Sequence, residues 1–210
     1  MPTSNQLKLS SPLSAAILLA CCASVVSASE PTQDDFAGLD RAYVPALALT
    51  KMGTPEASQK AMQRFTAQWK EFAARFEEGP ESDPHWKADF RKINRAVTEA
   101  SDLLNNGQQL DSHEALEEIR IILLEARKRN RVVYYLDYMT EFHETMEKIF
   151  AEVDGKMPSE LHADAIARIH RLTLKAYQQW EQVKTASFIE KRFGFDDKKM
   201  LQRRKLLEDE

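Results

Sequence analysis

Apolar side chains recur at spacings of three and four residues through most of the chain, which is the period of an amphipathic helix. Between residues 55 and 76 this repeat is carried by Met62, Phe65, Trp69, Phe72 and Phe76. Thr54 followed by Pro55 supplies an N-cap and a proline in the first turn. The same spacing predicts further helices over residues 84–105, 111–130, 135–154 and 158–185.

The positions of glycine separate these segments from one another. Five of the six glycines, Gly53, Gly79, Gly107, Gly155 and Gly194, fall between periodic stretches. No run of alternating β-branched residues indicates a strand. The pattern therefore predicts an all-α fold, an antiparallel helical bundle with a four-helix core.

Three points of helix structure are expected in addition. Asp111 and Glu114 have the spacing of a capping box at the start of the helix over 111–130. That helix is expected to break near Asn130 to Val133, where β-branched residues follow a basic turn, although one continuous helix is the alternative. An extra N-terminal helix over Asp34 to Lys51 is expected to be interrupted at Pro45.

The first 28 residues have the layout of a secretory signal peptide. Lys8 precedes an apolar run, and Val26-Ser27-Ala28 forms a small-residue cleavage site. An alternative is a lipoprotein signal ending at residue 20, in which Cys21 would be lipidated and would tether the protein to a membrane. Both alternatives predict an exported, periplasmic protein, with a helical-bundle domain over 34–185 and a charged C-terminal helix or tail over 186–210.

Charge and cysteine content exclude several functions. Removal of Lys8 with the signal peptide takes the net charge from −4 to −5, which argues against a nucleic-acid partner. The one dense basic cluster, residues 127–131, is typical of a helix C-terminus. Both cysteines lie within the signal peptide, so cleavage after Ala28 leaves no covalent c-type haem, iron–sulfur cluster or thiolate zinc site.

No catalytic motif is evident, so we expect a non-enzymatic protein. The chain has neither a phosphate-binding glycine loop nor a Gly-x-Ser-x-Gly elbow. His113 and His143 each begin a near match to the zinc-peptidase motif His-Glu-x-x-His, but Glu117 and Glu147 stand where the second histidine is required. No glutamate precedes a histidine by three residues, which excludes the ferritin-like di-iron pattern.

The best candidate ligands are Met139, His143 and Met146, which fall within an arc of about 60° on one helix. Two thioethers and an imidazole suit copper, and one methionine with one histidine suits haem iron. His170 on the last helix is expected within one turn of the level of His143, if the turn at Gly155 is tight. The alternative is that the methionines fill the core and the histidines bond to carboxylates or tyrosines.

An exported, cysteine-poor helical bundle with methionine and histidine available resembles the periplasmic four-helix-bundle cytochromes of the b type. That family takes an axial methionine from its first bundle helix and an axial histidine from near the end of its last. The corresponding helices here carry Met62 and His170. The resemblance implies a haem b ligand for the bundle over residues 55–185.

Two functions are therefore expected. The first is an exported binding protein that holds a transition metal or haem through Met139, His143, Met146 and His170. The alternative is an adaptor without a cofactor, which binds an unknown envelope protein through its helical surface and charged C-terminal tail. Contact with a membrane is expected only if Cys21 is lipidated.

Overall fold

The computed structural model describes residues 30–187 and 189–194, and within these ranges all regular structure is helical. The α-helices are α1 (Gln33–Met52), α2 (Pro55–Phe76), α3 (Trp86–Asn105), α4 (Gln109–Arg129), α5 (Tyr135–Val153) and α6 (Ala163–Thr185). Two short 3₁₀ helices, η1 (Pro158–Glu160) and η2 (Glu190–Phe193), flank α6. The all-α bundle is confirmed. The signal-peptide region, with Cys21, and the charged residues 195–210 lie outside the described residues.

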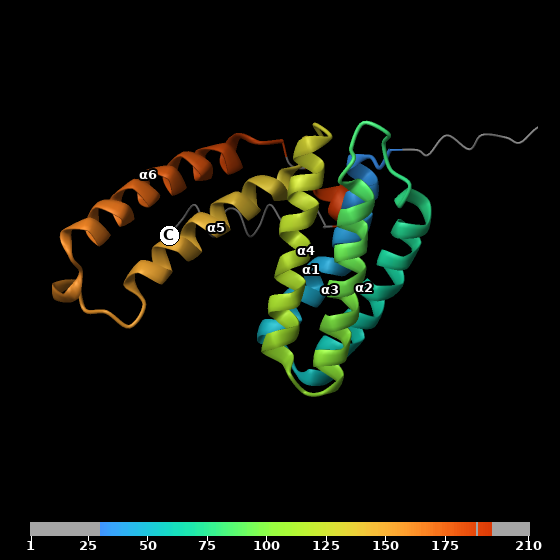
Figure 1. The fold of residues 1–210 in the computed structure, drawn as a ribbon, viewed down its shortest axis with the longest axis horizontal. Coiled ribbons are helices and arrows are strands. Elements are labelled where there is room, and N and C mark those ends of the chain that lie inside the picture. Colours follow the sequence, from blue (N-terminus) through green and yellow to red (C-terminus); the bar gives the residue numbers. More distant parts are fainter. Residues whose placement is uncertain (1–29, 188, 195–210) are drawn as a thin grey trace, which may run out of the picture.

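Helices α1 to α4 form an antiparallel four-helix bundle (Figure 1). Helix α1 packs on α2 and α4, and α3 packs on the same two helices, so the four enclose one core. Aromatic rings dominate this core: the ring centroids of Phe72 and Phe76 lie 4.8 Å apart, and those of Trp69 and Phe90 lie 5.1 Å apart. Most of these rings come from the repeat that predicted α2 and α3.

The four-helix core begins with α1, one helix earlier than the sequence pattern suggested. Phe36, Leu39 and Tyr43 of α1 are buried, and the hydroxyl of Tyr43 donates a hydrogen bond of 2.8 Å to the carbonyl of Leu116 on α4. The interruption expected at Pro45 does not occur, because α1 is helical on both sides of it. Pro45 lies on the exposed face of the helix, where a backbone carbonyl without an amide partner is accessible to water.

Local capping explains where several helices begin. The Thr54 hydroxyl accepts a hydrogen bond from the amide of Ala57, as its N-cap position predicted. The capping box expected from Asp111 is wrong, because α4 already begins at Gln109 and the Asp111 carboxylate accepts a hydrogen bond from the Gln108 side chain.

The turn between α2 and α3 depends on Gly79. This residue has φ of +61°, and a Cβ there would lie 2.0 Å from a ring carbon of Trp86. The indole of Trp86 occupies that space and donates a hydrogen bond of 2.7 Å to the carbonyl of Phe76. Helix α3 therefore begins at Trp86, two residues later than Pro84 suggested.

The expected break between α4 and α5 is confirmed. The amide of Val132 donates to the carbonyl of Arg127, and the amide of Arg131 donates to that of Lys128. These two bonds form a Schellman motif, which requires a left-handed residue after the helix. Arg131 fills that position with φ of 57°.

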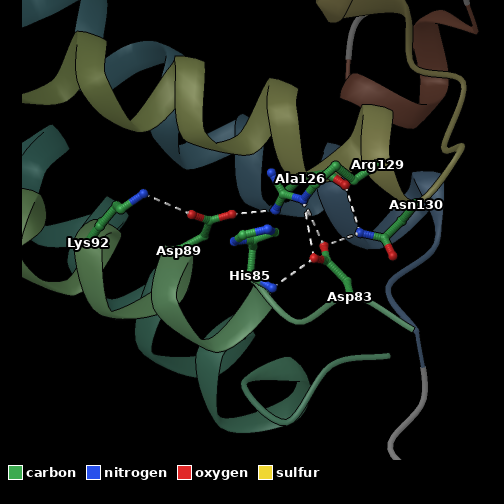
Figure 2. Close-up of polar contacts among 7 residues, drawn as sticks. All are labelled: Asp83, His85, Asp89, Lys92, Ala126, Arg129 and Asn130. Carbon is green, nitrogen blue, oxygen red and sulfur yellow. Dashed lines mark hydrogen bonds and ion pairs between the residues drawn. The ribbon is translucent and has the colours of Figure 1, made fainter. Parts of the chain in front are cut away.

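A polar network joins the end of α4 to the turn before α3 (Figure 2). The guanidinium of Arg129 bonds both oxygens of Asp83, each at 3.2 Å, and also pairs with Asp89. The Asn130 amide donates to Asp83 at 2.7 Å. Burial raises the pKa of Asp83, but hydrogen bonds from Arg129, Asn130 and the His85 amide outweigh it and leave the pKa below its ordinary value. Part of the basic cluster is thus occupied by ion pairs inside the protein.

Helices α5 and α6 form an antiparallel hairpin that projects from the side of the bundle (Figure 1). The main packing partner of α6 is α5, and α5 meets the bundle mainly through α4. The chain then returns to the bundle, where η2 packs on α1. The hairpin is therefore attached at both of its ends.

Candidate functional site

The predicted ligand residues on α5 divide between two environments. Met139 and His143 line a pocket at the base of the hairpin, between α1, α4 and α5. Met146, one turn further along α5, is half-buried beyond that pocket. The Nε2 atom of His143 lies 2.9 Å from a carboxylate oxygen of Glu147, so its nearest polar partner is on its own helix.

His170 does not lie level with His143. Arg168 pairs with Glu152 at 2.7 Å, and the rings of Phe142 and Trp180 have centroids 5.4 Å apart. In both contacts the two residues are equally far in sequence from residues 160–161, the midpoint of the hairpin. By the same pairing, His143 lies beside residue 178. His170 is therefore displaced by roughly 12 Å along the helix axis. The expectation of a shared level assumed a tight turn at Gly155, whereas the connection runs to His162 and contains η1.

Within residues 30–187 and 189–194, no three or more His, Cys, Asp or Glu side chains are grouped so as to hold a metal ion. His113, the other helical histidine with a glutamate four residues later, is buried in the bundle. One ring nitrogen lies 3.0 Å from the carbonyl of Leu47, and the other lies 3.5 Å from Glu117. These contacts place His113 within the packing of α1 against α4.

The most prominent surface feature of the hairpin is an apolar stripe on α6. Its members are large and exposed: Ile166 (52%), Leu174 (53%), Tyr177 (65%) and Trp180 (42%). At 100° per residue these four positions fall within an arc of about 120°. We call this set the α6 stripe.

The α6 stripe lies outside the seam between the two helices. The buried residues of α6 are Ala165, Ala176 and Val183, which are all small. Trp180 borders the seam through its contact with Phe142. Ile166, Leu174 and Tyr177 therefore face away from the interior of the hairpin, while Ala165, Ala176 and Val183 are buried.

The two helices of the hairpin carry opposite charge. Helix α5 has five acidic residues and one basic residue, whereas α6 has four basic and two acidic residues. Exposed apolar side chains next to basic ones are typical of a surface that binds a partner of complementary charge.

The base of the hairpin is fixed by a buried ion pair. The Nε atom of Arg127 on α4 lies 3.0 Å from each carboxylate oxygen of Asp137 on α5. The guanidinium carbon also lies 4.6 Å from the ring centroid of Tyr134. Burial lowers the pKa of Arg127, but the bonds to Asp137 outweigh it and hold the pKa above its ordinary value. The side chain is therefore a permanent cation inside the protein.

A second contact at the base joins the hairpin to α1. The hydroxyl of Tyr134 donates a hydrogen bond of 2.5 Å to Asp40. Burial raises the pKa of Asp40, and this effect outweighs the opposing influence of Arg127 and Tyr134. The ring of Phe193 packs on Tyr134 with a centroid distance of 5.8 Å, and Arg192 pairs with Asp34. Both ends of the hairpin are thus attached to α1, one at Asp40 and the other at Asp34.

No protein-family model, curated protein or solved structure matches the chain. Among residues 30–187 and 189–194, no helix is both long enough and apolar enough to cross a membrane.

Proposed function

We propose that this chain is an exported, non-enzymatic helical-bundle protein that binds a partner protein through the α6 stripe. The observation that carries the proposal is the exposure of four large apolar side chains, Ile166, Leu174, Tyr177 and Trp180, on one face of a projecting helix. Large apolar surfaces of this kind mark binding sites on soluble proteins.

The composition of the α6 stripe suits a protein interface. Tyrosine and tryptophan are enriched among the residues that dominate binding energy, because each buries a large area with few rotatable bonds. Burying one such side chain contributes about 1.5–3 kcal/mol. Tyr177 and Trp180 lie about one turn apart in the C-terminal half of α6.

The charge of α6 indicates the chemistry of the partner. Its four basic residues outnumber its two acidic ones, and two of them, Arg168 and Lys184, pair with Glu152 and Glu181 within the hairpin. A helix with an apolar face flanked by acidic residues would pack along the α6 stripe and match this charge. We therefore propose an amphipathic, acidic helix of another envelope protein as the partner.

Site-specific photo-crosslinking tests this proposal. A photoreactive amino acid is placed at Leu174 or Tyr177 of the full chain, in cells that export it, and at Lys175 as the matched control. Lys175 lies between these positions in sequence but points about 100° or more away from both on the helix. We expect adducts from 174 and 177 and none from 175, and sequencing of the adduct to identify an acidic amphipathic helix.

Three outcomes would contradict the proposal. The first is no adduct at 174 and 177, and the second is equal crosslinking at 175. The third is an adduct between two copies of this chain alone, which would show that the stripe serves self-association. Tyr177→Glu supplies an independent check, because it should remove the adduct formed at 174 without changing the helical circular dichroism.

Ligation of haem b or copper by Met139 and His143, with Met146 one turn further along α5, stays a second proposal, without His170, which lies too far along α6 to share their site. It is favoured by the one observation that Met139 and His143 line the same pocket. The absorption spectrum and elemental analysis of the protein purified from the periplasm test it. A Soret band or stoichiometric copper that disappears in His143→Ala would support it, and a colourless, metal-free protein that cannot be reconstituted would exclude it.

A further inference from the structure

Helix α5 carries an apolar face of its own, which the α6 stripe does not include. Phe150 is 61% exposed, and the other members of this face are half-buried: Phe142, Met146, Ile149 and Val153. At 100° per residue the five positions fall within an arc of about 100°. We call this set the α5 stripe.

Two contacts between α5 and α6 distinguish the two faces of the hairpin. The ring of Phe142 packs against that of Trp180, whereas Glu152 pairs with Arg168. On α6 the buried Ala176 lies between the directions in which Trp180 and Arg168 point. The aromatic contact therefore marks one face of the hairpin, and the ion pair marks the opposite face.

The α5 stripe and the α6 stripe lie on the same face. Each contains one member of the aromatic contact, and every residue of the α6 stripe points about 120° or more away from Arg168. The pairing about residues 160–161 places residues 142–153 of α5 level with residues 168–179 of α6. Since the two helices run side by side over this length (Figure 1), the hairpin has one apolar face that is two helices wide.

The charged residues of α5 lie away from this apolar face. They fall within an arc of about 140°, and the centre of that arc is opposite the centre of the α5 stripe. These residues are Asp137, Glu141, Glu144, Glu147, Lys148 and Glu152. An acidic partner can therefore cover both stripes without meeting the carboxylates of α5 directly.

One partner helix is too narrow to cover both stripes. Leu174 points about 120° away from Trp180, and Phe150 points about 80° away from Phe142, so each lies on the outer edge of its own helix. Both side chains are exposed. A single helix in the groove between α5 and α6 would leave these two edges in water, whereas two helices, packed 8–10 Å apart, would cover them and complete a four-helix bundle.

We infer that the partner docks as a pair of helices, with its acidic helix on the α6 stripe and a second helix on the α5 stripe. This inference rests on the proposed function, because it describes how the same partner binds. The second helix is apolar where it meets Met146 and Phe150. It carries no excess of acidic residues, because α5 itself has five acidic residues and one basic residue.

Photo-crosslinking from α5 tests the inference in the same full chain and the same exporting cells. The photoreactive amino acid is placed at Met146 or Phe150, and at Lys148 as the matched control, which points about 160° away from both. We expect adducts from 146 and 150 to contain the same partner protein as those from 174 and 177, and no adduct from 148. Sequencing of the adducts should show that 150 and 174 reach two different helices of that partner.

A neutral substitution supplies a second measurement. Phe150→Ser removes an exposed ring without adding charge, and it should lower the yield of the adduct formed at 177 by about fivefold or more. The helical circular dichroism should stay unchanged. Lys148→Ser, on the opposite face of α5, should leave the yield of that adduct unchanged.

The inference and the proposed function fail in different ways. Adducts at 174 and 177 with none at 146 and 150 would show that the α6 stripe alone forms the interface. Equal crosslinking at 148, or one partner helix reached from both 150 and 174, would exclude a pair of helices. An adduct from 146 or 150 to residues 195–210 of this chain, or to a second copy, would give the α5 stripe a different occupant. No adduct at any of 146, 150, 174 and 177 would refute the proposed function itself.

Discussion

The hydroxyl of Tyr134 donates a 2.5 Å hydrogen bond to the buried carboxyl group of Asp40, 94 residues earlier in the chain. This contact joins the residue just before α5 to the middle of α1. It is one of several polar contacts that hold the hairpin against the bundle, and the others include the pairs of Arg127 with Asp137, Lys128 with Glu141 and Arg192 with Asp34.

Removing the Tyr134 hydroxyl should destabilise the fold. Tyr134→Phe leaves Asp40 buried without its donor, and we expect a loss of about 1–3 kcal/mol in the free energy of unfolding. Urea denaturation followed by circular dichroism measures it. The control is Tyr177→Phe, whose hydroxyl lies on an exposed residue and should change stability by less than about 0.5 kcal/mol. Equal effects of the two variants would show that the bond to Asp40 contributes nothing.

The buried ion pair should behave as a unit. Arg127→Met leaves Asp137 unpaired, and we expect a loss of roughly 3–5 kcal/mol. The double variant Arg127→Met/Asp137→Leu should recover most of that loss, since it removes both charges. Lys128→Met removes an adjacent but half-exposed pair with Glu141 and should cost less than about 1 kcal/mol. Additive losses in the double variant would contradict the account of Arg127 and Asp137 given above.

Acid should weaken the network in Figure 2 through Asp83. The pKa of Asp83 is lowered from an ordinary value of 3.8, so the folded state binds its proton less readily than the unfolded state does. The stability that Asp83 contributes is therefore complete above the ordinary pKa and is lost as the pH falls through the lower, folded value. Urea denaturation at pH 6 and pH 3 should show a smaller difference for Asp83→Asn than for the wild type. Asp102→Asn, at an exposed site on α3, should keep the wild-type difference.

Two glycines with positive φ allow the backbone and steric contributions to be separated. Gly107 has φ of +77° with nothing within 4 Å of an added Cβ, so Gly107→Ala should cost only the left-handed backbone penalty of about 1–2 kcal/mol. Gly79→Ala meets the same penalty and also the ring of Trp86. Overpacking should add about 1–3 kcal/mol. Thermal and urea unfolding of both variants measure the difference, and equal losses would mean that Trp86 moves aside without cost.

The end of α4 offers a stabilising substitution. Arg131 occupies the left-handed position of the Schellman motif, where glycine has no Cβ penalty. We expect Arg131→Gly to raise the free energy of unfolding by about 1 kcal/mol, since the relief of backbone strain exceeds the added chain entropy. A lower stability than that of the wild type would indicate that the Arg131 side chain makes a net favourable contribution.

Sequence pattern predicted the helices well because their boundaries depend on local chemistry. The Thr54 cap and the break near Asn130 follow from capping groups and turn geometry within a few residues. The seam of α1 was also present in the sequence, since Phe36, Leu39, Tyr43 and Ala46 recur at spacings of three and four. Pro45 does not interrupt this seam, because a proline on the exposed face of a packed helix is tolerated.

The relation between helices was harder to predict, because a 3.6-residue period shows which face is apolar and not which helix will cover it. In α6 the structure buries Ala165 and Ala176 and leaves the larger Ile166 and Trp180 exposed. Leu174 and Tyr177 could have indicated this exposed face from the sequence. They make the apolar surface of α6 wider than a single packing contact with α5 requires. The position of His170 along α6 relative to His143 depended on the length of the connection between α5 and α6, which the apolar period does not reveal.

The attachment of the hairpin to the bundle at two points restricts how it can move. The connection through Tyr134 and the returning segment through Phe193 meet the bundle at the same corner, and their two rings are in contact. A force applied to the free end of α6 would be shared between two supports acting in parallel, one through α4 and one through α1. Bending at either connection alone is resisted by the other, so motion at the tip would tilt the hairpin as one rigid body.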